Sequence, residues 1–401
     1  MIINEVNITK EINKITEEIE QEVINIRRTI HKNPELAFKE FDTCKLIVNK
    51  LRKIGFDEIE IIEGTGVVAI LRGTKLGDCE EKTVMLRGDM DALPIKEETS
   101  LSFKSENSNM HACGHDAHVA WTLGTAMVLS RLKYLFRGRV KFVFQPGEEM
   151  GGAVGMVSRG VLDNPKVDIV MAGHCWPDLK SGEVGIANYT AMASTNTFKI
   201  TINGKGGHGA HPHECIDPIA IGTEIYSSIQ KIISRKTDSK NPTVISVCSF
   251  NSGTSRSTIP DICEIEGTVR ALTYEEVFKI NNDIENISKQ ICGIYGGNCT
   301  FEMGGICLPV VNNKNLTESF MVSAKDIIGE NNLKSIPYLA MTGEDFSEYS
   351  SRRDGLFLYI GSNNKDKYEN YKLHSCKFEI DENILKSTIG MFSKFIIDYL
   401  N

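Results

Sequence analysis

The sequence predicts an α/β protein with two domains, in which a smaller α+β domain is inserted into a larger, discontinuous α/β domain. Its 401 residues exceed what one compact core usually needs. Apolar runs alternate with helical patterns in both end regions, which is typical of α/β domains. The pattern changes near residue 190, so we expect one domain at residues 1–190 and 304–401 and the other at residues 191–303.

The larger domain begins with an amphipathic helix. Isoleucine and valine recur every three or four residues from Ile8 to Ile30, between the candidate N-cap Asn7 and Pro34, so we expect a helix over residues 8–32. The next elements follow in the order strand, strand, helix, strand, strand: Val67–Leu71, Val84–Leu86, residues 116–133, Val140–Phe144 and Val167–Ala172. After residue 311 a helix, a strand and a helix are expected at 315–329, Leu356–Ile360 and 382–399.

The middle of the chain predicts a β-α-β-β-α-β unit of the ferredoxin-like type. Phe198, Ile200 and Ile202 alternate with polar residues, as expected of a strand with one exposed face. The helix, two strands, helix and strand that follow are expected at residues 217–236, 243–250, 262–271, 274–292 and 299–310. The sequence has no low-complexity linker here, so we expect short hinges.

Composition and charge exclude several classes of protein. A hydrophobic fraction of 41% and a charged fraction of 24% are ordinary for a globular enzyme. The net charge of −8, without a basic run, excludes a typical nucleic-acid partner. The N-terminus lacks a signal-peptide pattern, and no apolar run approaches the roughly 18 residues that span a bilayer, so we expect a cytosolic protein without membrane contact. The eleven cysteines are scattered and odd in number, which favours reduced thiols.

The segment His111–His118, with the sequence HACGHDAH, concentrates side chains that bind metals. It contains three of the nine histidines, together with a thiol and a carboxylate. Cys113 and His115 lie two residues apart on a glycine-containing loop that enters a helix, so both can turn toward one point. Thiolate and imidazole are natural ligands of Zn, Mn, Co or Ni. The alternative is a polar helix start with a buried cysteine.

Three further polar segments follow predicted strands, at the position where α/β proteins place ligands. In Gln145–Gly152, neighbouring carboxylates point in different directions, so one can bind a metal while the other acts as a general base; the alternative is a solvated turn. His174 follows another strand and could equally be a core histidine. The carboxylates of Arg87–Pro94 could orient a metal-bound imidazole, or form an ion pair with Arg87.

With these segments, the chain resembles the M20 metallopeptidase superfamily, specifically its amidohydrolase branch of N-acyl amino acid, hippurate and auxin-conjugate hydrolases. The resemblance extends over nearly the whole chain. Its segments are Arg28–Glu40, Arg87–Pro94, His111–His118, Gln145–Gly152, His174–Pro177, Gly204–Pro212, Thr342–Phe346 and Leu373–Glu382. It implies a mixed-sheet metallopeptidase catalytic domain and an inserted lid and dimerisation domain.

The resemblance also implies a dinuclear metal site. Two divalent ions per subunit, each Zn, Mn, Co or Ni, would be bound by five side chains with Cys113 as the bridging ligand: Cys113, His115, Glu149, His174 and His374. Glu148 would be the general base for a metal-activated water, and Asp91 would support the ligands. Thr342–Phe346 would line the site. His208 would hydrogen-bond the scissile carbonyl, often in the partner subunit.

The expected function is hydrolysis of the amide bond of N-acyl amino acids or related small conjugates, by a homodimer or higher homo-oligomer. Ser257 stands where relatives commonly have an asparagine that contacts substrate, so the acyl and amino acid groups stay open. A dipeptidase or diaminopimelate-type deacylase of the same superfamily is the nearest alternative. A non-catalytic metal- or ligand-binding protein is a further one, although the intact Glu148 and ligand set argue against it.

Overall fold

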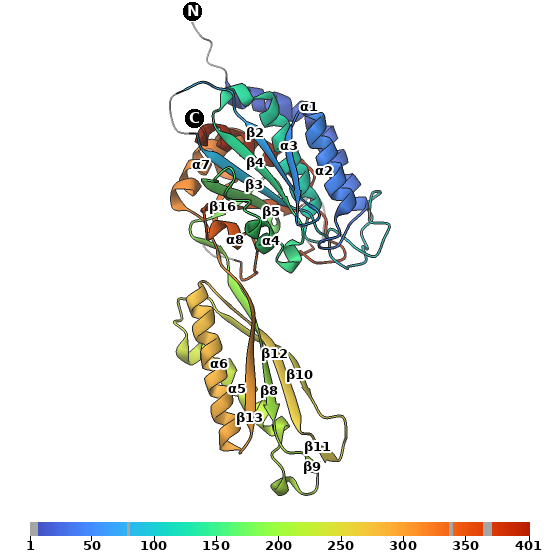
Figure 1. Cartoon of the computed structure of the whole chain (residues 1–401), viewed down its shortest axis with the longest axis vertical. Helices are drawn as coiled ribbons and strands as arrows, with labels where there is room; N and C mark the ends of the chain where they lie inside the picture. The colour runs from blue at the N-terminus through green and yellow to red at the C-terminus, as the bar shows by residue number, and fades with distance from the viewer. Residues whose placement is uncertain (1–6, 78–80, 337–339, 364–370) are drawn as a thin grey trace, which may run out of the picture. The chain divides into compact units, whose positions relative to one another are not determined.

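The structure, a computed structural model, describes residues 7–77, 81–336, 340–363 and 371–401 (Figure 1). Contacts divide the chain into two compact units. The larger unit consists of Met1–Ala191, Val311–Tyr338 and Glu348–Asn401, and the smaller one of Met192–Val310 and Leu339–Ser347. The predicted α/β class is confirmed, because the larger unit is built on a mixed sheet with helices packed against it.

The sheet of the larger unit has eight strands in the order β1-β2-β4-β3-β5-β16-β6-β15. Their bounds are β1 Glu58–Ile62, β2 Gly66–Arg72, β3 Thr83–Asp89, β4 Arg139–Gln145, β5 Ile169–Lys180, β6 Val184–Ala187, β15 Leu333–Ile336 and β16 Asp354–Asn363. The four central strands β4, β3, β5 and β16 run parallel, so their carboxyl ends lie at one edge of the sheet. That edge is where the polar segments predicted from the sequence follow their strands.

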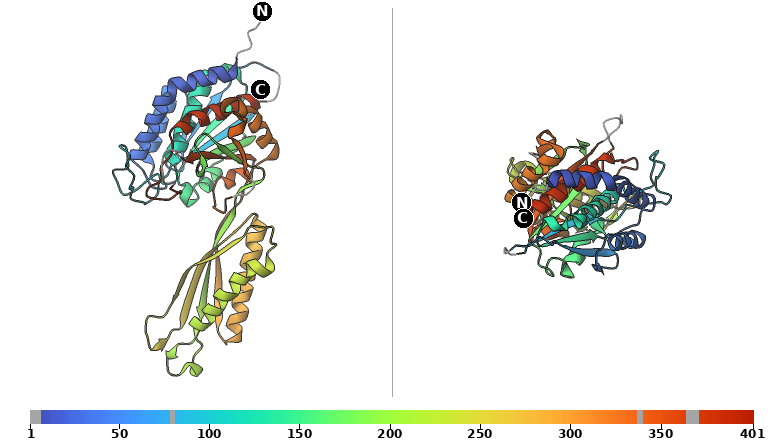
Figure 2. Two further views of the ribbon diagram at one scale, coloured as in Figure 1. Left: turned by 180° about the vertical axis from the view of Figure 1, so that it is seen from behind. Right: turned by 90° about the horizontal axis from the view of Figure 1, so that it is seen from above.

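Helix α3 (His115–Arg131) packs against two other long helices of the larger unit. This helix contacts α1 (Ile8–Lys32) and α9 (Asn383–Tyr399), and the three lie side by side in the right-hand view of Figure 2. The other helices are α2 Phe41–Lys53, α4 Ala153–Ser158, α7 Lys314–Ile328 and the short α8 Ser347–Ser350. The first fifteen residues of α3 are buried, which explains why its apolar residues show no one-sided pattern.

The smaller unit is a four-stranded antiparallel sheet with two helices on one face (Figure 2, left). In chain order its elements are β8 Ser194–Asn203, α5 Pro218–Lys236, β10 Val244–Ser252, β12 Ile262–Ala271, α6 Tyr274–Ile294 and β13 Asn298–Cys307. The order is the predicted β-α-β-β-α-β. Phe198, Ile200 and Ile202 are buried, whereas the residues between them are more exposed, as their alternation predicts.

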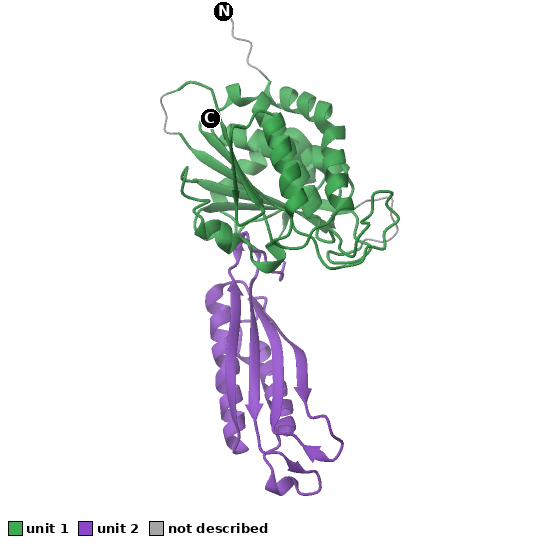
Figure 3. Cartoon of the chain, turned by 45° about the vertical axis from the view of Figure 1, so that its right-hand side comes forward, with its two compact units in different colours: residues 1–191, 311–338, 348–401 green, residues 192–310, 339–347 purple. Residues whose placement is uncertain are grey.

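Local sequence patterns match the observed elements best where they are long. Helix α1 has the predicted bounds, and its N-cap Asn7 accepts a hydrogen bond from the backbone N–H of Lys10 at 3.0 Å. Helix α2 and the strands β1, β6 and β15 were not predicted from the sequence. The expected domain boundary between residues 303 and 304 falls inside β13, a strand that belongs to the smaller unit (Figure 3).

Candidate metal centre

The candidate site lies in the larger unit, at the carboxyl ends of its parallel strands. Strand β3 ends at Asp89 and leads to Asp91, β4 leads to Glu148, and β5 carries His174. The buried first turn of α3 carries His115. Because parallel strands end at the same edge of a sheet, side chains from distant parts of the chain converge here.

Two groups of candidate ligands share the sulfur of Cys113. One group is Cys113, His115 and His174, and the other is Cys113, Glu149 and His374; within each group the ligand atoms lie within 4.8 Å of one another. Cys113 Sγ is 3.4 Å from His174 Nε2, and Glu149 Oε1 is 3.1 Å from His374 Nε2. The five residues predicted as metal ligands are therefore brought together. One sulfur common to two groups is the arrangement that a bridging ligand requires.

Two residues near Cys113, Gly114 and His374, have a left-handed backbone conformation. Gly114 precedes α3 with a φ of 89°, a left-handed conformation that glycine adopts without strain. An added Cβ there would lie 3.0 Å from Cys175 Sγ. His374 is one of three non-glycine residues with a positive φ in the part of the chain that the structure describes. Its φ is 63°, and its backbone N–H donates to the Ala112 carbonyl at 2.8 Å. This bond ties the C-terminal ligand segment to the Cys113 loop.

The charges of the site favour the thiolate form of Cys113. Burial raises the pKa of this thiol, but the imidazoles of His174 and His115 outweigh burial and lower it to about 6. Hydrogen bonds with Cys113 and Glu149 raise the pKa of His374 to about 10. Thiolate, imidazole and carboxylate together form a donor set that fits Zn, Mn, Co or Ni. Metal binding would displace protons from such a site, because ligands bind in their deprotonated forms.

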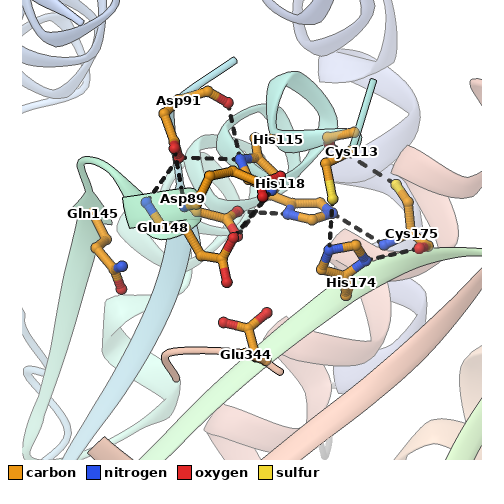
Figure 4. Close-up of polar contacts among 12 residues, drawn as sticks. Asp89, Asp91, Cys113, His115, His118, Gln145, Glu148, His174, Cys175 and Glu344 are labelled. Atoms are coloured by element: carbon orange, nitrogen blue, oxygen red, sulfur yellow. Dashed lines mark hydrogen bonds and ion pairs between the residues drawn. The ribbon is translucent and has the colours of Figure 1, made fainter. Parts of the chain in front are cut away.

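Asp91 holds both His115 and the turn that carries the two glutamates (Figure 4). Its Oδ1 lies 3.2 Å from His115 Nδ1, which also lies 2.9 Å from the Asp91 carbonyl. The same carboxylate accepts the backbone N–H groups of Glu148 at 3.0 Å and Glu149 at 3.1 Å. Fixing Nδ1 in this way directs Nε2 of His115 toward a metal position, as outer partners of metal-binding histidines usually do.

His118 and Asp89 form a second buried pair that was not predicted from the sequence. His118 Nδ1 lies 2.5 Å from Asp89 Oδ1, and its Nε2 accepts the backbone N–H of Cys175 at 3.0 Å. Arg87 donates to the other oxygen of Asp89 at 2.7 Å. Burial lowers the pKa of His118 to about 3. Both ring nitrogens of His118 are therefore engaged, although Asp89, His115 and His118 also form a group whose possible ligand atoms lie within 4.8 Å of one another.

Buried charges behind α3 connect helix α1 to two of the ligand segments. Arg27 pairs with Asp116, the neighbour of His115, at 2.9 Å, and with Glu382 at 2.9 Å. His31 lies 2.8 Å from Asp116 and 3.2 Å from Glu97. The sequence pattern assigned no role to Arg27. The pairing of residues so distant in the chain could not be read from local patterns.

The remaining predicted residues belong to the smaller unit. His208 lies in β9 (Gly207–His208), which pairs with β11 (Thr258–Ile259), and its Nδ1 accepts the backbone N–H of Ala210 at 3.1 Å. The Ser257 carbonyl accepts the backbone N–H of Gly209 at 2.8 Å, so the departure from the family pattern lies beside the His208 loop. Thr342–Phe346 also belongs to this unit. The roles of His208 and of this segment stay predictions.

Comparison with known proteins identifies the family of the chain. The model of peptidase family M20/M25/M40 matches residues 85–398. The chain belongs to this family. It is therefore a hydrolase of the M20 type, and the family predicted from the resemblance is confirmed. No helix in the described ranges is long and apolar enough to cross a membrane.

The relatives have related but distinct names. The chain is 41% identical over 374 residues to thermostable carboxypeptidase 2 of Saccharolobus solfataricus, covering 92% of this chain and 93% of that protein. It is 41% identical over 308 residues to an N-acyl-L-amino acid amidohydrolase of Geobacillus stearothermophilus, covering 76% and 81%. A solved dinuclear metal binding peptidase of the M20 family from Bacillus subtilis aligns with a TM-score of 0.81 and 31% identity, over 96% of this chain and 99% of that one.

Proposed function

We propose that this protein is a dinuclear-metal amidohydrolase that cleaves N-acyl amino acids or related small conjugates. The observation that carries the proposal is the pair of ligand groups that share Cys113. A buried sulfur with a lowered pKa suits a ligand that bridges two divalent ions. The similarity to the Bacillus subtilis protein, a dinuclear metal binding peptidase, supports two ions in this chain as well.

The chain's own residues divide the work of hydrolysis. Two divalent ions, when bound, acidify water and polarise an amide carbonyl. Glu148 would take the proton of the attacking water and return it to the leaving amine; its side chain is 11% exposed and lies 4.0 Å from His115 Nε2, which supports this role. His208 would donate a hydrogen bond to the developing oxyanion, a contribution of about 3 kcal/mol for a preorganised donor. The products are a carboxylic acid and an amino acid.

The two names among the relatives describe chemically similar substrates. An N-acyl amino acid and the C-terminal end of a peptide share an amide bond next to a free carboxylate, and they differ only in the acyl side. One metal centre could therefore serve both amidohydrolase and carboxypeptidase activities. Which of the two activities dominates depends on how much space the site offers to the acyl side of the substrate. Because Ser257 departs from the family pattern, this preference stays open.

The test is a panel of substrates assayed after metal-free protein is reconstituted with Zn, Mn, Co or Ni. N-acetyl and N-benzoyl amino acids, dipeptides, longer peptides and N-acetyldiaminopimelate cover the alternatives. Metal-dependent release of an amino acid from the acyl substrates supports the proposal. Preference for dipeptides or diaminopimelate derivatives would replace it with the alternative of the same superfamily. Metal binding without turnover of any substrate would favour a non-catalytic binding protein.

Assembly and location are proposed on the resemblance alone. We propose a homodimer or higher homo-oligomer, because the resemblance assigns the smaller unit to lid and dimerisation roles. Light scattering on a size-exclusion column tests this directly, and a monomer at working concentration would contradict it. The cytosolic location stays a prediction that fractionation of the source cells can check.

A further inference from the structure

Three consecutive backbone N–H groups in the turn after β4 are held by two buried carboxylates. Asp91 accepts those of Glu148 and Glu149, as described above, and Glu40 Oε1 accepts that of Gly147 at 2.9 Å. Successive N–H groups in such a turn form a concavity that binds anions. Here the anions are side chains of the protein itself, so the turn is fixed at both of its ends.

Glu40 reaches this turn from the segment between α1 and α2. It is fully buried, and its Oε1 also accepts the backbone N–H of Phe38 at 3.0 Å, while Thr65 Oγ1 donates to Oε2 at 2.7 Å. The Phe38 ring covers Gly147, because a Cβ on Gly147 would lie 2.7 Å from Phe38 Cζ. Gly147 has a φ of 60°, so both its conformation and the space around it require glycine.

We propose that Glu40 is a positioning residue of the metal centre, acting through the Gly147 N–H on the turn that directs Glu148 and Glu149. The inference rests on the proposed function. Asp91 alone holds the last two N–H groups, so loss of Glu40 leaves the first one buried without its acceptor. The turn can then rotate toward another partner. Glu149 belongs to the ligand group with Cys113 and His374, and that group should lose metal affinity first.

The experiment is a titration of metal-free protein with Co²⁺, followed by the absorption of the cobalt–thiolate bond. Wild-type protein should bind two ions. In Glu40→Ala, the affinity of one ion should fall at least about tenfold, which is the usual effect of removing an outer partner of a metal ligand, and the other should change little. Glu40→Asp, whose side chain is one methylene shorter, should weaken the binding of the same ion. This variant replaces Glu40→Ala in the experiment if the alanine variant does not fold.

Glu40→Gln separates hydrogen bonding from charge. Its side-chain oxygen can still accept both N–H groups, and its amide can donate to Thr65, so it should restore near-wild-type cobalt affinity. Glu35→Ala is the matched control, since Glu35 lies in the same segment but accepts the backbone N–H groups of Asp42 and Thr43 at 3.0 and 2.9 Å. It should lower the melting temperature without changing either cobalt affinity.

The outcomes separate this inference from the proposed function. If wild-type protein binds fewer than two cobalt ions, the dinuclear function itself fails. If wild-type protein binds two and the Glu40→Ala and Glu40→Asp proteins bind both with unchanged affinity, only the role of Glu40 is overturned. An equal loss of affinity in Glu35→Ala would also overturn it, because the effect would then be general destabilisation.

Discussion

The histidines of the larger unit and those of the loop in the smaller unit are held very differently. His115, His118 and His174 are buried, and each has its Nδ1 fixed at 2.5 to 3.2 Å from an oxygen. The loop histidines are exposed. They are His208, His211 and His213, with ring centroids 5.5 Å and 6.1 Å apart in succession.

The difference shows that environment, and not residue type, prepares a histidine for its role. In His115 and His174, a fixed Nδ1 orients Nε2 before any metal binds, so little ordering remains to be done on binding. The His208 ring has local contacts to orient it, namely the Ala210 N–H and the neighbouring ring of His211. Its proposed role therefore depends on closure of a lid, a step that several enzymes use to complete their sites.

The largest expected effect is that of Cys113→Ala, because this change removes the ligand common to both groups. Metal content should fall from two ions to one or none per chain, and amidase activity should be lost. Elemental analysis of the purified protein measures the first effect. Full metal content and normal turnover in this variant would show that the two groups do not share the sulfur.

Glu148→Ala should leave metal content near that of wild type but reduce kcat about 10³-fold, within the range of general acid–base catalysis. Its backbone N–H would still bond to Asp91, so the turn should persist. Steady-state kinetics and metal analysis of the same preparation test this separation. A variant that loses metal as well would make Glu148 a ligand instead of a base.

His208→Ala should reduce kcat about 10²-fold with little change in thermal stability, because the side chain is exposed and its proposed bond forms with the oxyanion. His211→Ala, from the same loop, is the matched control and should stay within about twofold of wild type. Equal losses in the two variants would assign the effect to the loop as a whole.

The smallest effect concerns the buried charges behind α3. Burial raises the pKa of Glu97, but hydrogen bonds from His31 and Thr99 outweigh burial, so the pKa lies below its usual 4.5. A depressed carboxyl pKa stabilises the fold above pH 4.5, and this contribution is lost as the pH falls through the folded-state value. The free energy of unfolding of metal-free protein should therefore decrease as the pH is lowered from about 5 to about 3.

Glu97→Gln should flatten this pH dependence, as measured by urea unfolding at the two pH values. The exposed pair of Glu18 with Arg131, at 2.8 Å, offers the control Glu18→Gln, which should leave the slope unchanged. His31 acts in the opposite sense. Although burial lowers the pKa of His31, Asp116 raises this pKa above 6.5. The stability that His31 contributes to the fold is therefore lost as the pH rises. An unchanged slope in Glu97→Gln would show that this carboxyl does not control the pH dependence.

Motif-bearing segments could be predicted because their information is local. The Cys113 loop, the two glutamates after β4 and the His174 strand end each combine reactive residues with a recognisable element. Helix α2 was missed even though Cys44, Ile47, Val48 and Leu51 recur at helical spacing and are buried. That pattern was present in the sequence and could have been used.

The supporting contacts could not be predicted, because their partners are far apart in the chain. Glu40 and Gly147 are separated by 107 residues, and Arg27 and Asp116 by 89. A buried carboxylate in a loop gives no local sign of which N–H group it will accept. Such pairs are chosen by the requirement that buried polar groups find partners once the sheet and helices have packed.

The sequence by itself determined which residue types carry the chemistry. It also determined that they lie at strand ends and at a helix start, since the periodicity of strands and helices can be recognised from neighbouring residues. The resemblance already implied Cys113 as the bridging ligand. Only the tertiary structure decided that His118 contacts Asp89 and Cys175, and that Glu40 reaches the glutamate turn. These outcomes depend on the parallel strands ending at one edge and on the burial of charges that must then be paired.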